Sequence, residues 1–565
     1  MRGRLRKGAF AAVATGALAI GIPVTAAAGH DRHHGGGGHG RHQHAIKHVL
    51  LISVDGLHQS DLNWYVANHP GSELAKLTAG GGEYASAQTP VPSDSDPGMT
   101  AQMTGGNPKT TGVFYDVEYN HALLPPGTTS CHGQPTGANV IYDSPDDINV
   151  NALDAGQGLS GLPGSILNMT STPQDLLVPS TFPVDPSTCK PISPSQYLKV
   201  NTIFNVAHDA GMLTAWSDKH PVYTSFNGPE GNGITDSFDP EIDSIALKPD
   251  GTPYPGNIAW TGDNAATMQY DSYKVQAVLN WIDGYNHSRT QKVGVPAILG
   301  MNFQTVSTAE KLPTSDGLAG GDLPGTNTPG PLLQRGLQYI NDQLQTMEQE
   351  IQSQGLADST AIVLSAKHGQ SPQDPSQLTR IDDGPIMDGV NTAWAATHPG
   401  APPLIAAGTD DDAVMWWLSD QSQQAARFAK HYLWTHTATG NTASGGSRTL
   451  PHSGLVKIYA GTAAARYFGV LASDPRHPNL WGVVQVGVVY TGGTGKIAEH
   501  GGSNPADRDV PLVVYAPGAV DRGVFRDPVE TTQIAPTILK LLGLDPDQLQ
   551  AVQIEGTRVL PGIGR

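Results

Sequence analysis

Two widely separated segments carry oxygen side chains suited to chemistry on an anionic ester. Asp55 follows an apolar run and precedes Gly56, where a capping role and an open carboxylate are both reasonable. Ser95 lies just before Pro97, and because proline favours the first turn of a helix, the serine hydroxyl should lie at a helix N-terminus. Backbone N–H groups and the helix dipole attract anions there, although the same hydroxyl could equally be a plain N-cap.

Two His-Gly pairs add nitrogen ligands to this set. His368 belongs to the segment SAKHG (365–369), and His500 belongs to EHGG (499–502). Both pairs lie at predicted turns beside strands, which fits metal or phosphate ligands. Either pair alone is weak evidence, since a single histidine is usually structural.

The elements that must position these side chains form an alternating pattern. Residues 48–54 (HVLLISV) are a continuous apolar run, typical of a strand buried on both faces. Similar runs lie next to polar residues at 213–216, 297–301, 361–365 and 510–515. Between them, apolar residues recur at helical spacing over 333–351, with Pro331 near the start of the helix and Gly355 after its end. This alternation predicts an α/β sandwich with a mostly parallel sheet, whose ligands bind beyond the carboxyl ends of the strands.

The order of these motifs resembles the alkaline phosphatase superfamily and, within it, the type I phosphodiesterase and nucleotide pyrophosphatase branch. The segments that carry the resemblance are SVDGL (53–57), Ser95 before TGGNPKTTG (104–112), SAKHG, EHGG and APTILKLLGL (535–544). Three others, TAWSDKHP (214–221), MNFQTVSTAEKL (301–312) and AKHGQSP (366–372), indicate a secreted subfamily. The resemblance runs from about residue 48 to 547. It implies a three-layer sandwich with helices on both faces of the sheet, loop-rich insertions at about 120–200 and 373–495, and hydrolysis of phosphoric esters.

The resemblance also implies a role for individual residues. Asp55, His368 and His500 match ligands of a divalent metal, with zinc as the expected ion. Ser95 matches the nucleophile, which is a threonine in many relatives. Asp116 falls where relatives often have an asparagine that helps to bind the phosphoryl oxygens.

Three positions depart from the two-zinc pattern of the relatives. Lys367 replaces an aspartate, and Ser307 and Lys311 replace an aspartate and a histidine four residues apart. A protonated lysine cannot bind a metal because it has no free lone pair, but its charge can neutralise a phosphate. Either Lys311 and Lys367 hold the ester in place of one or both metals, or the site has lost its activity. We expect Asp55, Ser95, His368 and His500 to converge in one pocket, into which Lys367 points while pairing with Asp55.

Lys311 should face the same anion from a loop after residues 297–301.

Three functions follow from this set of side chains. The first is a secreted phosphoesterase in which Ser95 attacks phosphorus while Lys311 and Lys367 hold its oxygens. The second is a binding protein without activity on the same fold. The third is a sulfatase-like ester hydrolase, which Met99 disfavours because it stands where the sulfatase motif has arginine.

The start of the chain predicts export. Residues 1–28 combine a basic segment, an apolar stretch and the small residues Ala26–Ala28, which is typical of a signal peptide cleaved near Ala28. The apolar stretch is too short for a membrane span, and no later stretch reaches that length. Residues 29–44 hold six histidines among glycines, so they form either a disordered leader or a zinc-scavenging tail. Residues 45–565 then form one catalytic domain with the two insertions.

The charge of the chain excludes some classes of binding partner, and its two cysteines predict a disulfide. The 51 acidic and 33 basic residues give a net charge of −18, which leaves no electrostatic footprint for nucleic acid or anionic lipid. The family resemblance implies a small-molecule phosphoester as the partner. In an exported protein, Cys131 and Cys189 should form a disulfide with Cα atoms about 4.4–6.8 Å apart.

The sulfatase alternative has a direct chemical test. A sulfatase would convert its active-site serine or cysteine to formylglycine, which changes the mass of the tryptic peptide around Ser95. We expect mass spectrometry of the purified protein to show an unmodified serine at this position. A formylglycine mass would instead establish the sulfatase-like function.

Overall fold

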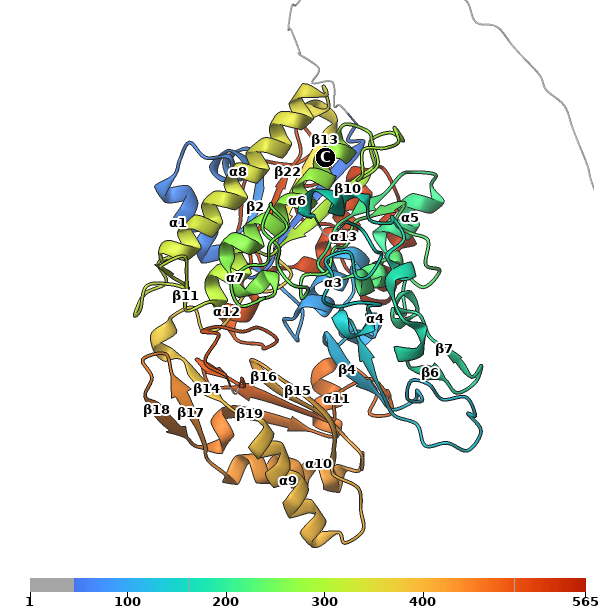
Figure 1. Ribbon diagram of the computed structural model, residues 1–565, viewed down its shortest axis with the longest axis vertical. Helices are drawn as coiled ribbons and strands as arrows, with labels where there is room; N and C mark the ends of the chain where they lie inside the picture. Colours follow the sequence, from blue (N-terminus) through green and yellow to red (C-terminus); the bar gives the residue numbers. More distant parts are fainter. Residues whose placement is uncertain (1–44, 161, 492, 565) are drawn as a thin grey trace, which may run out of the picture. The chain divides into compact units, whose positions relative to one another are not determined.

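The computed structural model describes residues 45–160, 162–491 and 493–564, so the expected signal peptide and histidine-rich leader lie outside the described residues. Within this part of the chain, a six-stranded sheet forms the centre of the fold (Figure 1). Its strands, in spatial order, are β10 (Ile298–Phe303), β1 (His48–Val54), β13 (Thr360–Ser365), β22 (Leu512–Tyr515), β2 (Gly82–Tyr84) and β23 (Gly523–Phe525).

The sheet is mostly parallel, as predicted. Strand β1 runs parallel to both of its neighbours, β10 and β13. The short strand β8 (Ala215–Trp216) lies beside β10 through two parallel bridges. Strand β22 is the exception, because it runs antiparallel to both β13 and β2. It therefore begins at the edge where β13 ends, and the chain that follows His500 enters the sheet from that edge.

Helices cover both faces of the sheet because successive β1 side chains point to opposite sides. Val49 and Leu51 belong to one buried cluster, while Leu50 and Ile52 belong to another. The helices of the first face are α3 (Ser95–Thr104), α5 (Ile203–Asp209) and α13 (Ile534–Leu541). Those of the second face are α1 (Gln59–Asn68), α2 (Glu73–Gly80), α6 (Asn264–Ile282), α7 (Thr305–Lys311) and α8 (Pro331–Ser353). The result is the predicted three-layer sandwich.

Helix α8 shows how closely periodicity predicts an element. Every apolar residue of the predicted stripe, from Leu333 to Ile351, is buried against the sheet layer. Pro331 occupies the first turn, where its missing N–H costs nothing. Gly355 lies just past the end with φ +69°, a left-handed conformation that glycine adopts without strain.

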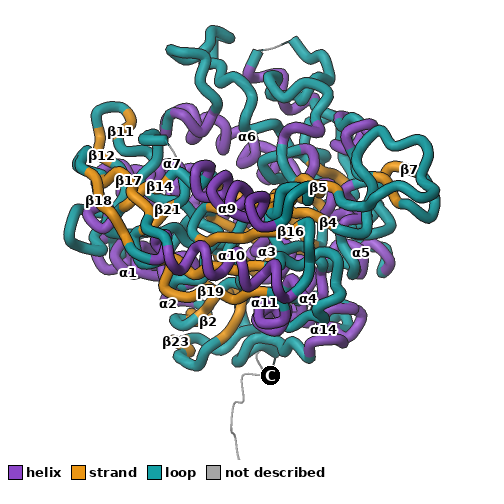
Figure 2. The backbone as a smooth tube through the Cα atoms, turned by 90° about the horizontal axis from the view of Figure 1, so that it is seen from below, coloured by secondary structure: helices purple, strands orange, loops and turns teal. Residues whose placement is uncertain are grey.

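Residues 379–489 build two further four-stranded sheets with a hydrophobic cluster of their own. The first contains β18 (Ser447–Leu450), β17 (Ala438–Thr442), β14 (Thr379–Ile381) and β21 (Val488–Val489), and the second contains β15 (Ile405–Asp410), β16 (Ala413–Leu418), β20 (Leu480–Val484) and β19 (Leu455–Ala460). Helices α9 (Gly384–Thr397) and α10 (Gln423–Thr435) cover one face of the second sheet, and α11 (Thr462–Phe468) follows β19 (Figure 2). This segment is more regular than the loop-rich insertion predicted here.

The segment between residues 117 and 200 is irregular, as its composition predicts. It contains short hairpins, β4 (Val117–Asn120) with β5 (Ala138–Ile141) and β6 (Val184–Asp185) with β7 (Lys190–Pro191), joined by single helical turns. Cys131 and Cys189 form a disulfide with their Cα atoms 5.7 Å apart, inside the predicted range. Among the described residues, none of the helices combines the length and the apolar character that crossing a bilayer requires.

Removing the disulfide should destabilise this segment. The bond closes a loop with a sequence separation of 58, which the chain-entropy description values at about 4 kcal/mol. A Cys131→Ser, Cys189→Ser double variant should therefore unfold at lower denaturant concentration and be cut by proteases within residues 117–200. Equal denaturant midpoints and equal protease resistance would contradict the stabilising role of the bond.

Candidate active site

Two strand ends and one helix start bring the predicted residues together. Asp55 directly follows β1, and Lys367 and His368 follow β13. Because these strands are parallel, their carboxyl ends meet at one edge of the sheet. Ser95 is the first residue of α3, and the N-cap is Asp94, so the N-cap interpretation of Ser95 was wrong by one residue.

The Ser95 hydroxyl lies between a cation and an imidazole. Lys219 Nζ donates a hydrogen bond to Ser95 Oγ at 3.2 Å, and His368 Nε2 lies 3.4 Å from the same oxygen. The other ring nitrogen of His368, Nδ1, lies 3.0 Å from the carbonyl oxygen of Gly369. With Nδ1–H donating to that carbonyl, Nε2 keeps a lone pair that faces the hydroxyl.

Close contact between α3 and the loop after β13 requires a glycine. A Cβ atom at Gly98 would lie 2.0 Å from the carbonyl oxygen of Lys367. Any other residue would push the start of α3, with Ser95, away from His368. The glycine thus determines the distance between the two side chains.

Asp55 lies between two basic side chains, Lys367 and His368. Its Oδ2 lies 3.1 Å from Lys367 Nζ, and its Oδ1 lies 3.1 Å from His368 Nε2. Gln304 also donates to Oδ2 at 2.8 Å. Burial raises the pKa of Asp55, but Lys367 and His368 outweigh it and hold the pKa well below its usual range. Asp55 is therefore a carboxylate despite being 2% exposed.

Lys367 has the predicted partner but not quite the predicted position. Its ammonium is fully buried and pairs with Asp55, as expected. It lies behind that carboxylate, however, and Lys219 rather than Lys367 lines the cavity beside Ser95. Burial lowers the pKa of Lys367, and Asp55 opposes this effect.

Lys219 is the main residue to which the sequence analysis gave no role. Burial lowers its pKa, but Asp55, Asp143 and Asp116 outweigh this and raise the pKa above its ordinary value. The side chain is therefore a cation at neutral pH. Its position in the sequence was informative, because Lys219 follows β8 just as Lys367 follows β13.

A cavity of about 230 Å³ opens above these residues. Asp55, Lys219 and His500 are part of its lining, while Ser95 and His368 have no exposed surface and lie beneath it. The His368 and His500 rings lie 4.0 Å apart between centroids. His500 Nδ1 also contacts Asp94 Oδ1 at 2.9 Å, so the segment EHGG (499–502) contacts the N-cap of helix α3.

Lys311 lines the same cavity from the end of helix α7, not from a loop as predicted. Its Nζ lies 2.9 Å from Glu499 Oε2, and Lys496 contacts the other oxygen of this carboxylate. Burial raises the pKa of Glu499, but both lysines outweigh it and lower the pKa. Two ammonium groups on one carboxylate leave a net positive charge at this wall. Ser307, one turn before Lys311, also lines the cavity.

Asp116 lines the cavity where relatives often place an asparagine. Its backbone N–H donates to Asp94 Oδ2 at 2.9 Å, and its Oδ1 accepts from the Val117 N–H at 2.8 Å. Burial and the charges of Asp94 and Asp143 raise the pKa of Asp116 well above its ordinary value. A protonated carboxyl can donate a hydrogen bond, as an asparagine amide does.

Comparisons with known proteins agree with this geometry. The sequence profile of the family described as type I phosphodiesterase / nucleotide pyrophosphatase matches residues 49–503. The chain belongs to this family. It is therefore a hydrolase of the class that acts on phosphoric ester bonds. A search of curated protein sequences finds no match.

Solved structures show the same fold. The alkaline phosphatase PafA matches with a TM-score of 0.58 at 11% identity, over 92% of this chain and 99% of that one. Human ectonucleotide pyrophosphatase/phosphodiesterase 5 matches with a TM-score of 0.51 at 12% identity, over 92% and 97%. An inactive mouse form of the latter enzyme, solved in complex with AMP, also has a TM-score of 0.51 at 11% identity, with the same coverage. At these identities the likeness establishes the fold alone.

The site does not fit the two-metal centre that the family resemblance implies. Among the described residues, two groups of three or more His, Asp or Glu side chains have ligand atoms within 4.8 Å of one another. The predicted ligands Asp55, His368 and His500 are not one of these groups. Instead, Lys367 pairs with Asp55 and Lys311 pairs with Glu499. Ammonium groups thus lie at positions where the family resemblance implies metal ligands.

The cavity should bind anions less well as the pH rises through neutrality. Burial and the charge of Glu499 raise the pKa of Asp411, a cavity-lining residue, to about 7. Asp411 is neutral below this pH and becomes a carboxylate above it, which repels an anionic ester. We expect KM for a phosphodiester to increase between pH 6 and pH 8 by a few-fold, and Asp411→Asn to remove most of this increase. An identical pH profile in the variant would show that another group is responsible.

Proposed function

We propose that the protein is an exported phosphodiesterase or nucleotide pyrophosphatase that uses Ser95 as nucleophile and lysines in place of metal ions. The observation that carries this proposal is the position of Ser95 Oγ, 3.2 Å from Lys219 Nζ and 3.4 Å from His368 Nε2. A cation next to a hydroxyl favours its ionised form, and a neutral imidazole can accept its proton. Burial keeps His368 neutral by lowering its pKa below the ordinary value.

The reaction would proceed in two steps. Ser95 Oγ forms a bond to phosphorus while the bond from phosphorus to the leaving oxygen breaks, and His368 Nε2 takes the hydroxyl proton. The new imidazolium lies beside Asp55 Oδ1, which is 3.1 Å away and stabilises its charge. His368 passes the proton to the leaving oxygen. Water then attacks the phosphorus of the serine ester while His368 takes a proton from it, the Oγ–P bond breaks, and Ser95 Oγ receives that proton from His368.

Positive charge for the transition state comes from the lysines. Lys219 must move from Ser95 Oγ to the phosphoryl oxygens when substrate enters, because it covers a hydroxyl with no exposed surface. Lys311 lines the same cavity from the end of helix α7. Lys367 acts through Asp55 and is a positioning residue. Protonated Asp116 would donate to a phosphoryl oxygen, as the asparagine of relatives does.

The substrate class follows from the family and the cavity. A nucleotide ester would place its phosphate at Ser95 and extend into the remaining volume, and the mouse neighbour solved with AMP gives a precedent for this class. The cavity also has walls from residues 142–143 and 242–243, and from Asp411. We assign specificity to these segments because they line the volume that remains when a phosphate lies at Ser95.

A phosphate-binding protein without activity is the second candidate. Two observations favour it: Ser95 has no exposed surface, and lysines replace metal ligands. Both functions need the positive charge of Lys219 and Lys311, so only turnover separates them.

Replacing Ser95 tests turnover directly. Ser95→Ala should reduce kcat/KM for a chromogenic phosphodiester by about a thousandfold or more, because it removes the attacking atom. Ser353→Ala, an exposed position at the end of α8, is the matched control and should leave the rate unchanged. Wild-type protein that binds phosphate but shows no turnover above the Ser95→Ala variant would establish the binding function.

Restoring the family's aspartate tests the lysine hypothesis. Lys367→Asp places a second carboxylate beside Asp55 and removes its cation, so activity should be lost unless added zinc restores it. Lys292→Asp makes the same charge change on an exposed loop and serves as the control. Unchanged activity of Lys367→Asp without added metal would exclude any contribution of Lys367 to catalysis.

A further inference from the structure

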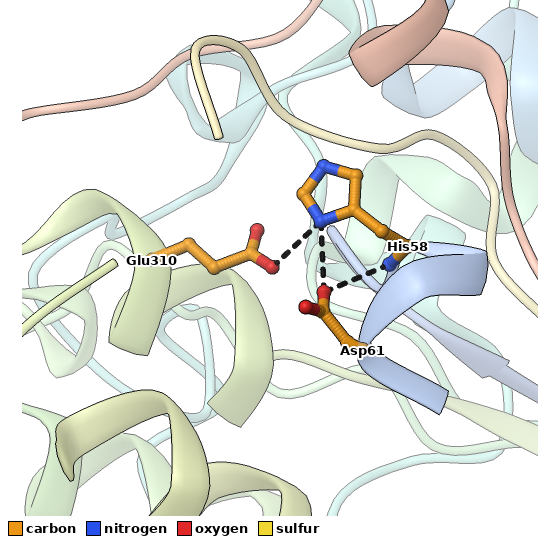
Figure 3. A group of neighbouring side chains, drawn as sticks. All are labelled: His58, Asp61 and Glu310. Atoms are coloured by element: carbon orange, nitrogen blue, oxygen red, sulfur yellow. Dashed lines mark hydrogen bonds and ion pairs between the residues drawn. The ribbon is translucent and has the colours of Figure 1, made fainter. Parts of the chain in front are cut away.

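A second cluster of ionisable side chains lies away from Ser95, on the other side of the turn after β1. His58 directly precedes helix α1, Asp61 lies in the first turn of that helix, and Glu310 belongs to α7. His58 Nδ1 lies 2.8 Å from Asp61 Oδ2 and 3.2 Å from Glu310 Oε1, so both carboxylates face one ring nitrogen (Figure 3). One ligand atom from each residue lies within 4.8 Å of the others, and all three residues are buried.

The cluster surrounds a cavity of about 10 Å³, which is room for a single water-sized body. Asp322 and Gln370 also line it. Gln370 is fully buried, and neither its amide oxygen nor its amide nitrogen has a hydrogen-bond partner. The same holds for Glu310 Oε2 and for both carboxylate oxygens of Asp322, while Glu310 Oε1 has only the His58 ring as a neighbour. Buried polar atoms are almost always hydrogen-bonded, so this set points to an absent ligand.

The charge of the cluster points to a cation. Asp61, Glu310 and Asp322 are at most 4% exposed. In the part of the chain that the structure describes, no ion pair joins a lysine or arginine to any of them. Buried carboxylates are either paired with a cation, protonated or bound to a metal, and here the only basic neighbour among the described residues is the His58 ring. Asp55 differs from these three carboxylates because a lysine, Lys367, pairs with it.

We propose that His58, Asp61 and Glu310 bind one divalent metal ion of the zinc class, with Asp322 or Gln370 as a further ligand. One imidazole with carboxylates favours a borderline metal, whereas calcium and magnesium sites use oxygen ligands. In a tetrahedral zinc site with bonds of about 2.0–2.2 Å, neighbouring ligand atoms are about 3.4 Å apart. The contacts of 2.8 and 3.2 Å need only a small expansion to admit the ion.

The backbone of Gln370 orients the imidazole. The Gln370 backbone N–H donates to His58 Nε2 at 3.0 Å, and the Gln370 carbonyl oxygen lies 2.8 Å from the same ring nitrogen. Metal binding at Nδ1 requires the tautomer in which Nε2–H donates to that carbonyl, because the lone pair then lies on Nδ1. Metal-binding histidines commonly donate their second N–H in this way.

The turn after β1 is built to let these groups meet. A Cβ atom on Gly56, which has φ +83°, would lie 2.1 Å from Gln370 Nε2 and 2.8 Å from Glu310 Oε2. The ion would hold α7 against the loop after β13. Glu310 precedes Lys311, and Gln370 lies two residues after His368, so the metal would add thermal stability to the packing of these two segments.

Metal content and thermal stability test this site without relying on hydrolysis. Full-length wild type, Glu310→Gln and Asp61→Asn are dialysed against zinc and then against metal-free buffer. Wild type should retain one more zinc ion per chain than either variant. Asp243→Asn, in the more exposed group Asp143, His220 and Asp243, is the matched control and should retain the wild-type amount. Zinc held by the histidines of residues 29–44 is common to all four proteins and cancels in the difference.

A chelator should lower the Tm of wild type by at least about 2 °C, and zinc should restore it. The Glu310→Gln variant should show no such response. Equal zinc content in wild type and variants, or a wild-type Tm that chelator leaves unchanged, would show that protons rather than a metal hold the cluster together. If the variants do not fold, the wild-type response to chelator and zinc decides alone. Neither readout depends on Ser95, so this proposal and the proposed function fail separately.

Discussion

The buried carboxylate of Asp55 is the constraint on which the site depends. A charge at 2% exposure is costly unless a cation pairs with it, and this protein supplies Lys367 from an adjacent strand end, next to His368. Those two residues reach Asp55 because β1 and β13 are adjacent and parallel. Ser95 then contacts His368 because Gly98 lets helix α3 approach the same loop. The order of the strands, Gly98 and Asp55 together determine where Ser95 lies.

Replacing metals by lysines changes the chemistry that the family fold can support. A metal ion accepts several oxygen ligands and can activate them at once, whereas an ammonium group only donates hydrogen bonds and charge. Three lysines line the cavity and together supply positive charge in place of a metal ion: Lys219, Lys311 and Lys496. In the proposed mechanism this arrangement would replace a metal in the cavity. Proton transfer would then fall to His368, whose pKa is lowered by burial.

The sequence predicted the architecture well because its signals are local. The run at 48–54 is apolar on both faces and forms the central strand, and the stripe in 333–351 becomes the buried face of α8. The convergence of Asp55, Ser95 and His368 followed from the rule that parallel strands end at one edge. The cysteine count and the expected compartment alone predicted the disulfide.

Other features depend on contacts between distant segments and could not be predicted from local patterns. The direction of β22 is set by its pairing with β13 and β2, not by its composition. Lys311 lies in a helix because Val306 and Ala309 pack into the second core cluster. Lys219 contacts Ser95 across 124 positions, a pairing that no periodicity encodes. The His58 cluster likewise joins residues from helix α1, helix α7 and the loop after β13.

The central claim is that hydrolysis at Ser95 needs no metal in the cavity. The most direct measurement is kcat for a phosphodiester as a function of the metal content of the same preparation, well below its unfolding temperature. Our account predicts the same kcat per chain in chelator-treated and metal-loaded protein. A kcat that falls to background on metal removal and returns in proportion to zinc added, saturating at two ions per chain, would contradict it.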